Sequence, residues 1–384
     1  MTLPPSTTTV RPDADLAVLA RLGALRTSLD AALLERKEEV QCALITAIAG
    51  QHLLLLGPPG TGKTYLAMML ARGLGIDRDR IFVRLLTKHS VPEELFGPYS
   101  LRGLEEDRYE RKIEKYLPEV QFAVLDEIFK ANSAILNHLL TLLNERAFDN
   151  GTTRIDCPLE FCLGMSNETP QDDGLAALYD RFVLRRWVRY LNDEDNFRAL
   201  LRSGTTPPAV SALEPGDLDA LRAMAAQVVV GDEVVDVVIE IRRELSEKGI
   251  APSDRRYKVG MSLIQARALL NGRTEALPDD AIILKDCLWD LPEDVPTVTS
   301  IVVGKASPDL NEALRIRDTA VEAFQTVDLS KIETAPALEA RRRLQALKAE
   351  AEALKQSWQI QEVISDIGKM ETSIKRAVAE AMGL

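Results

Sequence analysis

The sequence predicts an α/β fold built on a mostly parallel sheet, followed by a second half made of helices. Short apolar runs of strand length alternate with helical segments along the first half of the 384-residue chain, which is typical of parallel α/β domains. A glycine-rich phosphate-binding motif follows the first of these runs and opens a helix. Beyond residue 190 the helical periodicity continues without further strand-like runs.

Strands and helices are expected to alternate up to residue 190. Residues 1–13 are rich in proline and threonine, a composition typical of disorder. Residues 14–49 carry apolar side chains at helical spacing. Leu53–Leu56 is wholly apolar, as expected for a buried parallel strand. The other expected strands are Ile81–Leu85 and residues 122–125, 161–165 and 183–188.

The second half is expected to be helical. Helical patterns within residues 191–290 indicate a small helical domain. Residues 291–307 are rich in proline and valine and show no clear helical period, whereas the chain from residue 309 onward is helical and charge-dense. Residues 291–384 are therefore expected to form a helical C-terminal extension. The helices expected within the small domain are residues 232–248, 254–270 and 279–290.

Two heptad-like apolar seams run along the end of the chain, and their register changes near residues 358–360. The change fits either a hairpin turn between two helices or a stutter in one longer helix. Such seams bind a partner or pack within the chain, and packing within the chain is favoured. The seam residues are Leu344, Leu347, Ala351, Leu354 and Trp358, then Val363, Ile364, Ile367, Met370 and Ile374.

Charge and composition disfavour several classes of function. The net charge of −12 opposes nonspecific binding to nucleic acid or to anionic membranes. No apolar run approaches the roughly 18 residues of a membrane-spanning helix, and the N-terminus lacks the pattern of a signal peptide. The cysteines form no metal-type CxxC pair, so buried, reduced thiols of a cytoplasmic protein are expected. They are Cys42, Cys157, Cys162 and Cys287.

Residues 57–64 match the phosphate-loop pattern GxxxxGK[ST] completely and lie between an expected strand and a helix over residues 63–74. Glycines let backbone N–H groups point at one phosphate, and the helix N-terminus adds partial positive charge. Lys63 is expected to reach the β- and γ-phosphates, and Thr64 to ligate Mg²⁺. The nucleotide-binding loop comprises Gly57, Pro58, Pro59, Gly60, Thr61, Gly62, Lys63 and Thr64.

A second motif is the apolar strand that ends in Asp126 and Glu127. Its carboxylates are expected at the carboxyl edge of the sheet, where ligands of α/β folds bind. Asp126 is expected to hold Mg²⁺, largely through a water, and Glu127 to polarise the attacking water as a general base. Because a doubled acid favours water as the phosphoryl acceptor, the pair predicts hydrolysis rather than phosphorylation of a small molecule.

Further blocks of sequence occur in one order at residues 86–98, 116–118, 126–131, 135–137, 142–146, 166–168 and 177–182. Over about residues 28–290 the chain resembles the MoxR-type AAA+ ATPases, most closely their RavA branch. The resemblance implies an AAA+ core with a five-stranded parallel sheet over residues 14–190 and an α-helical lid over residues 191–290. It also implies a homo-oligomeric ring, usually a hexamer, with ATP bound between subunits.

The resemblance implies roles for single residues. Asn167 is similar to the polar residue that orients the attacking water, and a turn-forming asparagine is the alternative. Arg181 resembles the arginine finger that reaches the ATP of the neighbouring subunit, and an ion pair with Asp180 is the alternative. One arginine at the start of the second lid helix resembles the residue that contacts the phosphates. Arg255 is favoured for this role, and Arg256 is the alternative.

Two hairpins are expected in the core. Residues 98–117 resemble the family's insert after the second strand, with strands at 101–104 and 109–113 around a polar turn. Residues 145–155 form the second, with Asn150-Gly151 as a strong signal for a two-residue turn. In the family such hairpins face the central pore of the ring, and plain surface hairpins are the alternative.

The favoured function is an ATP-driven remodelling or chaperone-like motor that acts with a von Willebrand factor A (VWA) domain protein, a partner common in the family. A nucleic-acid motor of the helicase type is the first alternative, although the second hairpin carries more acidic than basic side chains. A nucleotide-gated scaffold with slow hydrolysis is another alternative. An insertion motor similar to magnesium chelatase is disfavoured, because the chain offers no metal-handling residues.

Overall fold

The computed structural model describes residues 12–170, 173–204, 208–328, 332 and 334–382. It divides into two compact units, the first formed by residues 1–234 and 252–291 and the second by residues 235–251 and 292–384. The disorder expected for residues 1–13 falls outside the described residues except at its end, where the first helix begins at Pro12. Among the described residues, no helix has the length and apolar character needed to cross a bilayer.

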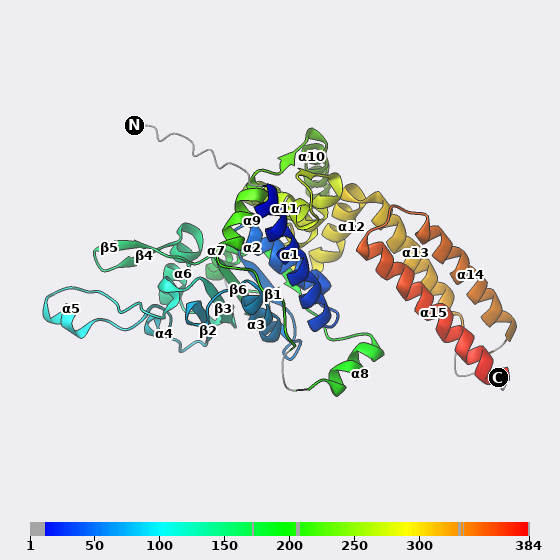
Figure 1. Ribbon diagram of the computed structural model, residues 1–384, viewed down its shortest axis with the longest axis horizontal. Coiled ribbons are helices and arrows are strands. Elements are labelled where there is room, and N and C mark those ends of the chain that lie inside the picture. The colour runs from blue at the N-terminus through cyan, green and yellow to red at the C-terminus, as the bar shows by residue number, and fades with distance from the viewer. Residues whose placement is uncertain (1–11, 171–172, 205–207, 329–331, 333, 383–384) are drawn as a thin grey trace. The chain divides into compact units, whose positions relative to one another are not determined.

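The first unit is built on a five-stranded sheet. Figure 1 shows this sheet among the helices of the unit. The strand order is β2-β3-β6-β1-β7, and every neighbouring pair is parallel. The prediction of an α/β fold with a five-stranded parallel sheet is therefore confirmed. The strands are β1 (Leu53–Leu56), β2 (Ile81–Leu85), β3 (Phe122–Asp126), β6 (Phe161–Ser166) and β7 (Leu184–Trp187).

The central strands are fully buried, which explains why their sequences are continuous apolar runs rather than alternating ones. Because β1 lies between β6 and β7, the loops after β1, β3 and β6 leave the same edge of the sheet within reach of one another. The other elements of this core are α1 (Pro12–Ala32), α2 (Lys37–Ile48), α3 (Lys63–Gly73), α6 (Ser133–Glu145) and α7 (Ala176–Arg181).

The single helical pattern over residues 14–49 divides into α1 and α2. The chain turns at Glu35, which has a left-handed backbone conformation with φ 55°. The Glu35 carboxylate accepts hydrogen bonds from the backbone N–H groups of Asn192 and Asp193, at 2.8 and 3.0 Å. These bonds connect the turn between α1 and α2 to the segment after β7. Helical periodicity in the sequence does not predict such a long-range contact.

The expected hairpin at residues 145–155 is present as β4 (Ala147–Asn150) and β5 (Thr153–Asp156). Asn150 pairs with Thr153, so the turn lies at Gly151 and Thr152, one residue later than predicted. Gly151 has φ 65°, and a Cβ there would lie 2.6 Å from the Tyr109 carbonyl oxygen. Glycine is therefore required at this position both by conformation and by the close approach of the insert.

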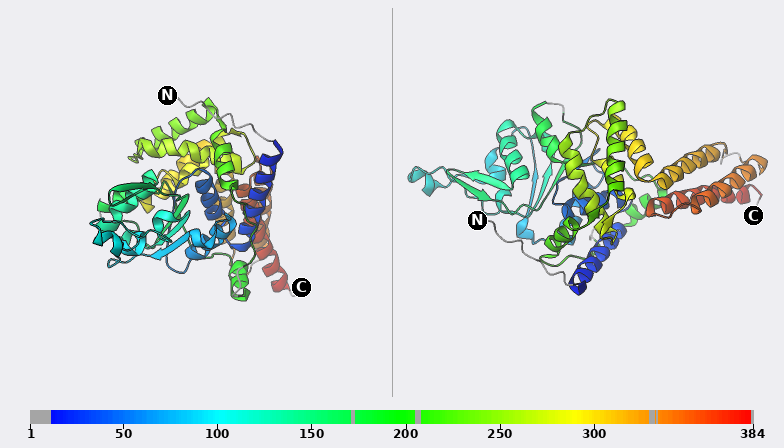
Figure 2. Two further views of the ribbon diagram at one scale, coloured as in Figure 1. Left: turned by 60° about the vertical axis from the view of Figure 1, so that its left-hand side comes forward. Right: turned by 90° about the horizontal axis from the view of Figure 1, so that it is seen from above.

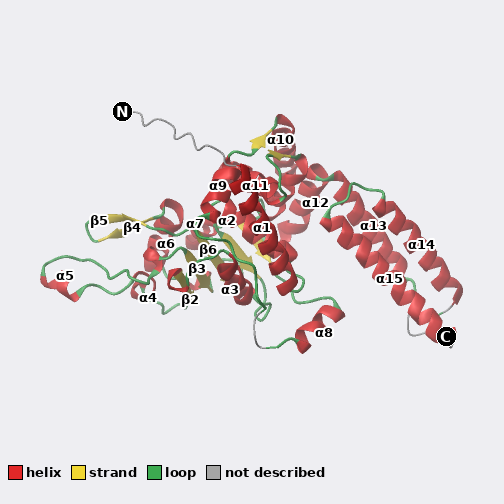
Figure 3. Ribbon diagram, viewed as in Figure 1, coloured by secondary structure: helices red, strands yellow, loops and turns green. Residues whose placement is uncertain are grey.

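The insert after α4 (Pro92–Phe96) is only partly a hairpin, as Figure 3 shows. Tyr99 and Arg111 form an antiparallel bridge, but the expected strand at 101–104 is instead the short helix α5 (Leu101–Glu105). The reason is local, because the Ser100 side chain caps this helix by accepting a hydrogen bond from the Gly103 N–H.

The helical part of the first unit contains one departure from the expected helices. Residues 278–286 wind as a 3-10 helix instead of the α-helix expected over residues 279–290. Pro278 opens it, and the buried Asp280 is held by two hydrogen bonds from Arg273, at 2.6 and 2.7 Å. The elements here are α8 (Glu194–Arg202), α9 (Asp217–Ala226), β8 (Val229–Val230), α10 (Asp232–Glu247, which continues into the second unit), α11 (Asp254–Leu270), β9 (Glu275–Ala276) and η5 (Pro278–Asp286).

The second unit corrects the expectation for residues 291–307, where no helical period was found. Residues 295–306 form the helix α12 (Val295–Ala306). Its buried residues lie on more than one side of the helix, so the sequence shows no amphipathic period. They are Val298, Ile301, Val302, Val303 and Ala306. Lys305 pairs with Glu240 and Glu244 at the end of α10, at 3.5 and 3.4 Å.

The apolar seams at the end of the chain pack within the chain. α13 (Pro308–Gln325), α14 (Thr334–Glu352) and α15 (Trp358–Met382) run side by side, as Figure 2 shows. The register change is therefore a hairpin turn, and it lies between residues 352 and 358. The buried seam residues are Leu344, Leu347, Ala351, Val363, Ile364, Ile367 and Ile374.

All four cysteines are buried and free, as predicted. Burial raises the pKa of the Cys162 and Cys287 thiols to about 12 and that of Cys157 to about 11. These side chains therefore behave as small apolar groups in the core rather than as nucleophiles.

Candidate nucleotide-binding site

The phosphate loop leaves the central strand β1 and enters α3. The Gly57 N–H donates to the Ser166 carbonyl oxygen at 3.2 Å. A Cβ at Gly57 would lie 2.2 Å from the Val188 carbonyl oxygen, so only glycine fits between the neighbouring strands. Gly62 has φ 83° and caps α3, whose N-terminal N–H groups are left for an anion.

Two side chains that the motif does not include brace the loop. The buried Arg36 donates to the carbonyl oxygens of Thr61 and Arg189, at 3.0 and 2.7 Å. The Tyr190 hydroxyl donates to the Pro59 carbonyl oxygen at 3.1 Å. Arg36 is not predicted from the sequence, because a single arginine between two helices carries no local signal of this contact.

Lys63 lies folded against the loop and reaches a second strand end. Its Nζ donates to the carbonyl oxygens of Gly57 and Pro58, at 2.7 and 3.0 Å, and to Asn167 Oδ1 at 3.1 Å. The three donors of the ammonium group thus each have an acceptor. Burial lowers the Lys63 pKa, while the charges of Asp126 and Glu127 oppose this shift.

Asn167 joins Lys63 to the acidic strand end. Its Nδ2 donates to Glu127 Oε1 at 2.5 Å, and Glu127 Oε2 lies 3.3 Å from Lys130 Nζ. Lys63, Asn167, Glu127 and Lys130 thus form one polar chain across the ends of β1, β6 and β3. The sequence alone predicts no role for Lys130, although Lys130 lies three residues beyond Glu127 in the block of residues 126–131 that carries the family resemblance.

Asp126 and Thr64 offer oxygen ligands of the kind that Mg²⁺ prefers. Asp126 is half-buried, and burial raises its pKa, with the Glu127 charge adding to the shift. Its Oδ1 accepts the Glu127 N–H at 2.9 Å, a geometry made possible by the left-handed conformation of Glu127, with φ 52°. Thr64 is exposed in the first turn of α3. Both residues offer oxygen atoms, Thr64 at the start of α3 and Asp126 at the end of β3, so both are suited to hold Mg²⁺.

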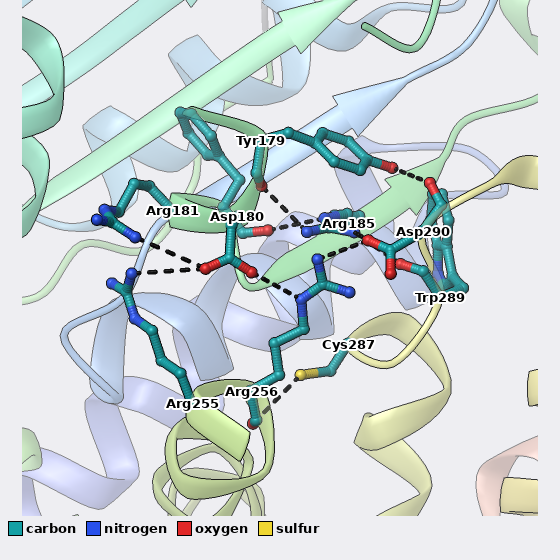
Figure 4. Close-up of polar contacts among 10 residues, drawn as sticks. Tyr179, Asp180, Arg181, Arg185, Arg255, Arg256, Cys287, Trp289 and Asp290 are labelled. Carbon is teal, nitrogen blue, oxygen red and sulfur yellow. Dashed lines mark hydrogen bonds and ion pairs between the residues drawn. The ribbon is translucent and has the colours of Figure 1, made fainter. Parts of the chain in front are cut away.

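The arginines singled out from the sequence form a separate group around Asp180, shown in Figure 4. Arg181 Nη1 and Arg255 Nη1 each lie 3.6 Å from Asp180 Oδ2. Arg255 Nη2 also donates to Asn144 Oδ1 at the end of α6, at 3.0 Å. The Arg256 side chain is only 5% exposed and donates through Nε to Asp180 Oδ1 at 3.1 Å. The structure therefore brings Arg255 together with Arg181, and Lys63 together with Asn167 and Glu127.

A buried arginine pair connects α11 with β7 behind this group. Arg256 Nη2 donates to Asp290 Oδ1 at 2.6 Å, and Arg185 Nη1 donates to the same oxygen at 3.1 Å (Figure 4). Arg185 is fully buried, donates to the Trp289 carbonyl oxygen at 2.7 Å, and lies 3.7 Å from the ring centroid of Tyr179. The sequence alone does not predict the pairing of Arg185 with Asp290, because the two residues lie 105 positions apart along the chain.

Comparisons with known proteins agree with this arrangement. A family model described as "MoxR domain in the MoxR-vWA-beta-propeller ternary systems" matches residues 20–228, and an AAA lid domain model matches residues 233–302. An uncharacterised protein of Methanocaldococcus jannaschii is 33% identical over 319 residues, which is 82% of this chain and 83% of that protein. A second uncharacterised protein of the same organism is 35% identical over 284 residues, covering 74% of this chain and 75% of the relative.

A solved structure shows the same fold. The crystal structure of a proposed ATPase from Cytophaga hutchinsonii aligns with a TM-score of 0.63 at 18% identity, over 76% of this chain and 96% of that one. The family models together span the sheet, the phosphate loop and the helices that follow them. The chain therefore belongs to the MoxR family of AAA+ ATPases.

Proposed function

We propose that this chain hydrolyses ATP in a homo-oligomeric ring, usually of six subunits, and uses the energy to remodel protein clients together with a VWA-domain partner. The observation that carries the ATPase part is the polar chain from Lys63 through Asn167 to Glu127, at the edge of the sheet where the phosphate loop begins. Asn167, which is suited to orient a water molecule, links the phosphate-binding ammonium group of Lys63 to Glu127, the proposed general base.

The chain's own residues divide the work as follows. The loop N–H groups and Lys63 bind the phosphates. Thr64 and Asp126 would hold Mg²⁺, which would supply positive charge that offsets the charge of the phosphate groups. Asn167 orients the attacking water, and Glu127 accepts its proton. When ATP binds, before the chemical step, Lys63 exchanges the carbonyl oxygens of Gly57 and Pro58 for phosphate oxygens, which are stronger acceptors.

We propose that each site is shared by two subunits. The support is the separation of the polar contacts into two groups, because Arg181 pairs with Asp180 on α7 and not with the Lys63 group. Arg255 is the better candidate for the lid arginine, since it is 36% exposed whereas Arg256 is held between two carboxylates.

In the proposed domain organisation, residues 14–190 form the AAA+ core, residues 191–290 the lid and residues 291–384 the C-terminal extension.

The matched family model supports a VWA-domain partner, because its description places such MoxR domains in ternary systems with vWA and β-propeller proteins. That description does not name the RavA branch, so placement in that branch stays a prediction. A cytoplasmic location is part of the proposal and is supported by the four buried, free thiols.

The partner is tested by affinity capture from the native host. The full chain carrying Glu127→Gln is used as bait with ATP, because this variant is expected to hold nucleotide and remain assembled. The matched control is the Lys63→Ala chain, which is expected to load ATP poorly. We expect a VWA-domain protein to be enriched with the Glu127→Gln bait. Repeated captures without such a protein would contradict the partner assignment.

The β4–β5 hairpin gives no support to a nucleic-acid motor. Arg154 forms an ion pair with Glu145, and Arg146 turns inward to hydrogen-bond with His52 and the Gly50 carbonyl oxygen. These basic side chains are therefore engaged within the protein rather than presented to phosphates. Stimulation of ATP turnover by DNA or RNA would favour the nucleic-acid motor instead, and slow turnover that no partner changes would favour a scaffold.

Lys63→Ala is expected to weaken ATP binding about 10- to 100-fold, because the charge-assisted hydrogen bonds to the phosphates are lost. The measurement is calorimetric titration of the purified chain with ATP and Mg²⁺. Lys112→Ala, which removes an exposed lysine of the insert, is the control and should leave the affinity unchanged. Equal affinities of the Lys63→Ala chain and the unmodified chain would remove Lys63 from the binding site.

A further inference from the structure

Asp180 has two carboxylate oxygens with different surroundings, as Figure 4 shows. Oδ1 accepts a hydrogen bond from Arg256 Nε at 3.1 Å. Arg256 is itself anchored, because its Nη2 donates to Asp290 Oδ1 at 2.6 Å and its side chain is only 5% exposed. The Asp180 carboxylate is thus fixed in position from the α11 side by a buried, hydrogen-bonded arginine.

The other oxygen faces two arginines that are held less tightly. Arg181 Nη1 and Arg255 Nη1 each lie 3.6 Å from Asp180 Oδ2, which is beyond ordinary hydrogen-bond length. Their side chains are 25% and 36% exposed, so both remain accessible from outside the subunit. The carboxylate orients both guanidinium groups through these long contacts, and Arg255 is held in addition by its hydrogen bond to Asn144 Oδ1 at 3.0 Å.

Positive charge is concentrated in this group. In the part of the chain that the structure describes, four arginines, including Arg185, pair with the two carboxylates of Asp180 and Asp290. Arginine keeps its charge at any physiological pH. The accessible part of this positive charge lies at Arg181 and Arg255, where an anion would be attracted.

We propose that Asp180 is a positioning residue for ATP hydrolysis, which holds the Arg181 guanidinium in place for the γ-phosphate of the neighbouring subunit's ATP. This inference rests on the proposed sharing of sites between subunits. The hydrogen bond from Arg256 to Oδ1 fixes the Asp180 carboxylate, and Oδ2 of this carboxylate orients the Arg181 guanidinium group. Because the Oδ2 contact is long, Arg181 exchanges it for a phosphate oxygen without breaking a strong bond.

The experiment replaces Asp180 by asparagine in the full chain, which keeps the shape of the side chain and removes its charge. We expect kcat for ATP to fall about 10- to 100-fold, as for a misplaced catalytic group, while KM for ATP stays nearly unchanged because the phosphate loop is intact. Asp219→Asn is the matched control, since Asp219 is an exposed aspartate paired with Arg222 and should leave kcat unchanged. Asp290→Asn is a second variant. Because Asp290 anchors Arg256, this replacement is expected to lower kcat by a smaller factor than Asp180→Asn and to lower thermal stability as well.

Mixed rings distinguish positioning from folding. An Asp180→Asn subunit keeps its own Glu127, and a Glu127→Gln neighbour keeps a correctly held Arg181, so each mixed interface can restore one site. We expect the mixture to turn over ATP several-fold faster than the sum of the two variants alone. A change in KM alone, or a mixture with no gain, would overturn the role of Asp180.

Two further variants, Arg181→Ala and Asp180→Ser, separate failure of the positioning role from failure of the shared site and from misfolding. Arg181→Ala mixed with Glu127→Gln tests the shared site itself. If that mixture gains activity and the Asp180→Asn mixture does not, only the positioning role fails, whereas no gain in either mixture refutes the proposed sharing. If Asp180→Asn does not fold, Asp180→Ser takes its place in the same test. Failure of both to fold would show that Asp180 is structural and would overturn the proposal.

Discussion

Replacement of Glu127 by glutamine is expected to lower ATP turnover about 10²- to 10⁴-fold, the range that a positioned general base contributes. Glutamine keeps the length of the side chain and an oxygen that can accept the Asn167 hydrogen bond, now 2.5 Å long. It cannot accept a proton from water. ATP binding and assembly should persist, because the phosphate loop and Asp126 are untouched.

Steady-state phosphate release, calorimetric ATP binding and the mass of the assembly should be measured on the same preparation. Glu119→Gln is the matched control. Glu119 is an exposed carboxylate that lies just before the N-terminal end of β3, whereas Glu127 follows the C-terminal end, so the replacement should not affect turnover. Unchanged turnover in Glu127→Gln would remove Glu127 from the chemistry. Loss of ATP binding would instead assign it to the binding site.

Much of the geometry of the candidate nucleotide site could be predicted from the sequence, because local motifs determine it. The glycine-rich loop and the acidic strand end each lie within eight residues, and parallel strands bring their carboxyl ends to one edge. Lys63 and Glu127 could therefore be placed together in advance. Asn167 carried no such local motif, and its place between them was implied only by the family resemblance.

The contacts that hold the site could not be predicted, since they join residues far apart in sequence. Arg36 reaches Arg189 across 153 positions, and Arg256 reaches Asp180 across 76. The sequence around a single arginine or aspartate looks the same whether its side chain is exposed to solvent or lies at the centre of a buried hydrogen-bond network. Asp180 was considered only as a surface partner of Arg181, whereas the structure shows it bound to a buried arginine as well.

The fold departs from prediction where local capping or a wide buried face overrides periodicity. The buried residues of α12 lie on more than one side of the helix, so its helical period is not visible in the sequence. α5 replaces an expected strand because Ser100 offers a helix cap. The β4–β5 turn is displaced by one residue because the Asn150 side chain pairs with the backbone N–H and carbonyl oxygen of Arg111, at 2.6 and 3.1 Å.

Arg181→Ala is expected to lower turnover about 10³- to 10⁵-fold, the effect of an arginine finger on phosphoryl transfer. The guanidinium group would stabilise charge that develops on the γ-phosphate, so the loss should appear in kcat rather than in ATP affinity. Arg154→Ala is a suitable control, because Arg154 is an exposed arginine paired with a surface glutamate. A loss of affinity with kcat unchanged would indicate a binding role instead.

The location of the defect distinguishes a shared site from a site within one chain. In a mixture with Glu127→Gln, the Arg181→Ala subunit supplies an intact Glu127 and its neighbour supplies an intact Arg181. If the finger acts across the interface, mixed assemblies regain activity that neither variant has alone. If Arg181 acts on its own chain's nucleotide, every site in the mixture lacks one of the two groups and no activity returns. Titrating the mixing ratio should then give a maximum at intermediate composition in the first case and a uniformly low rate in the second.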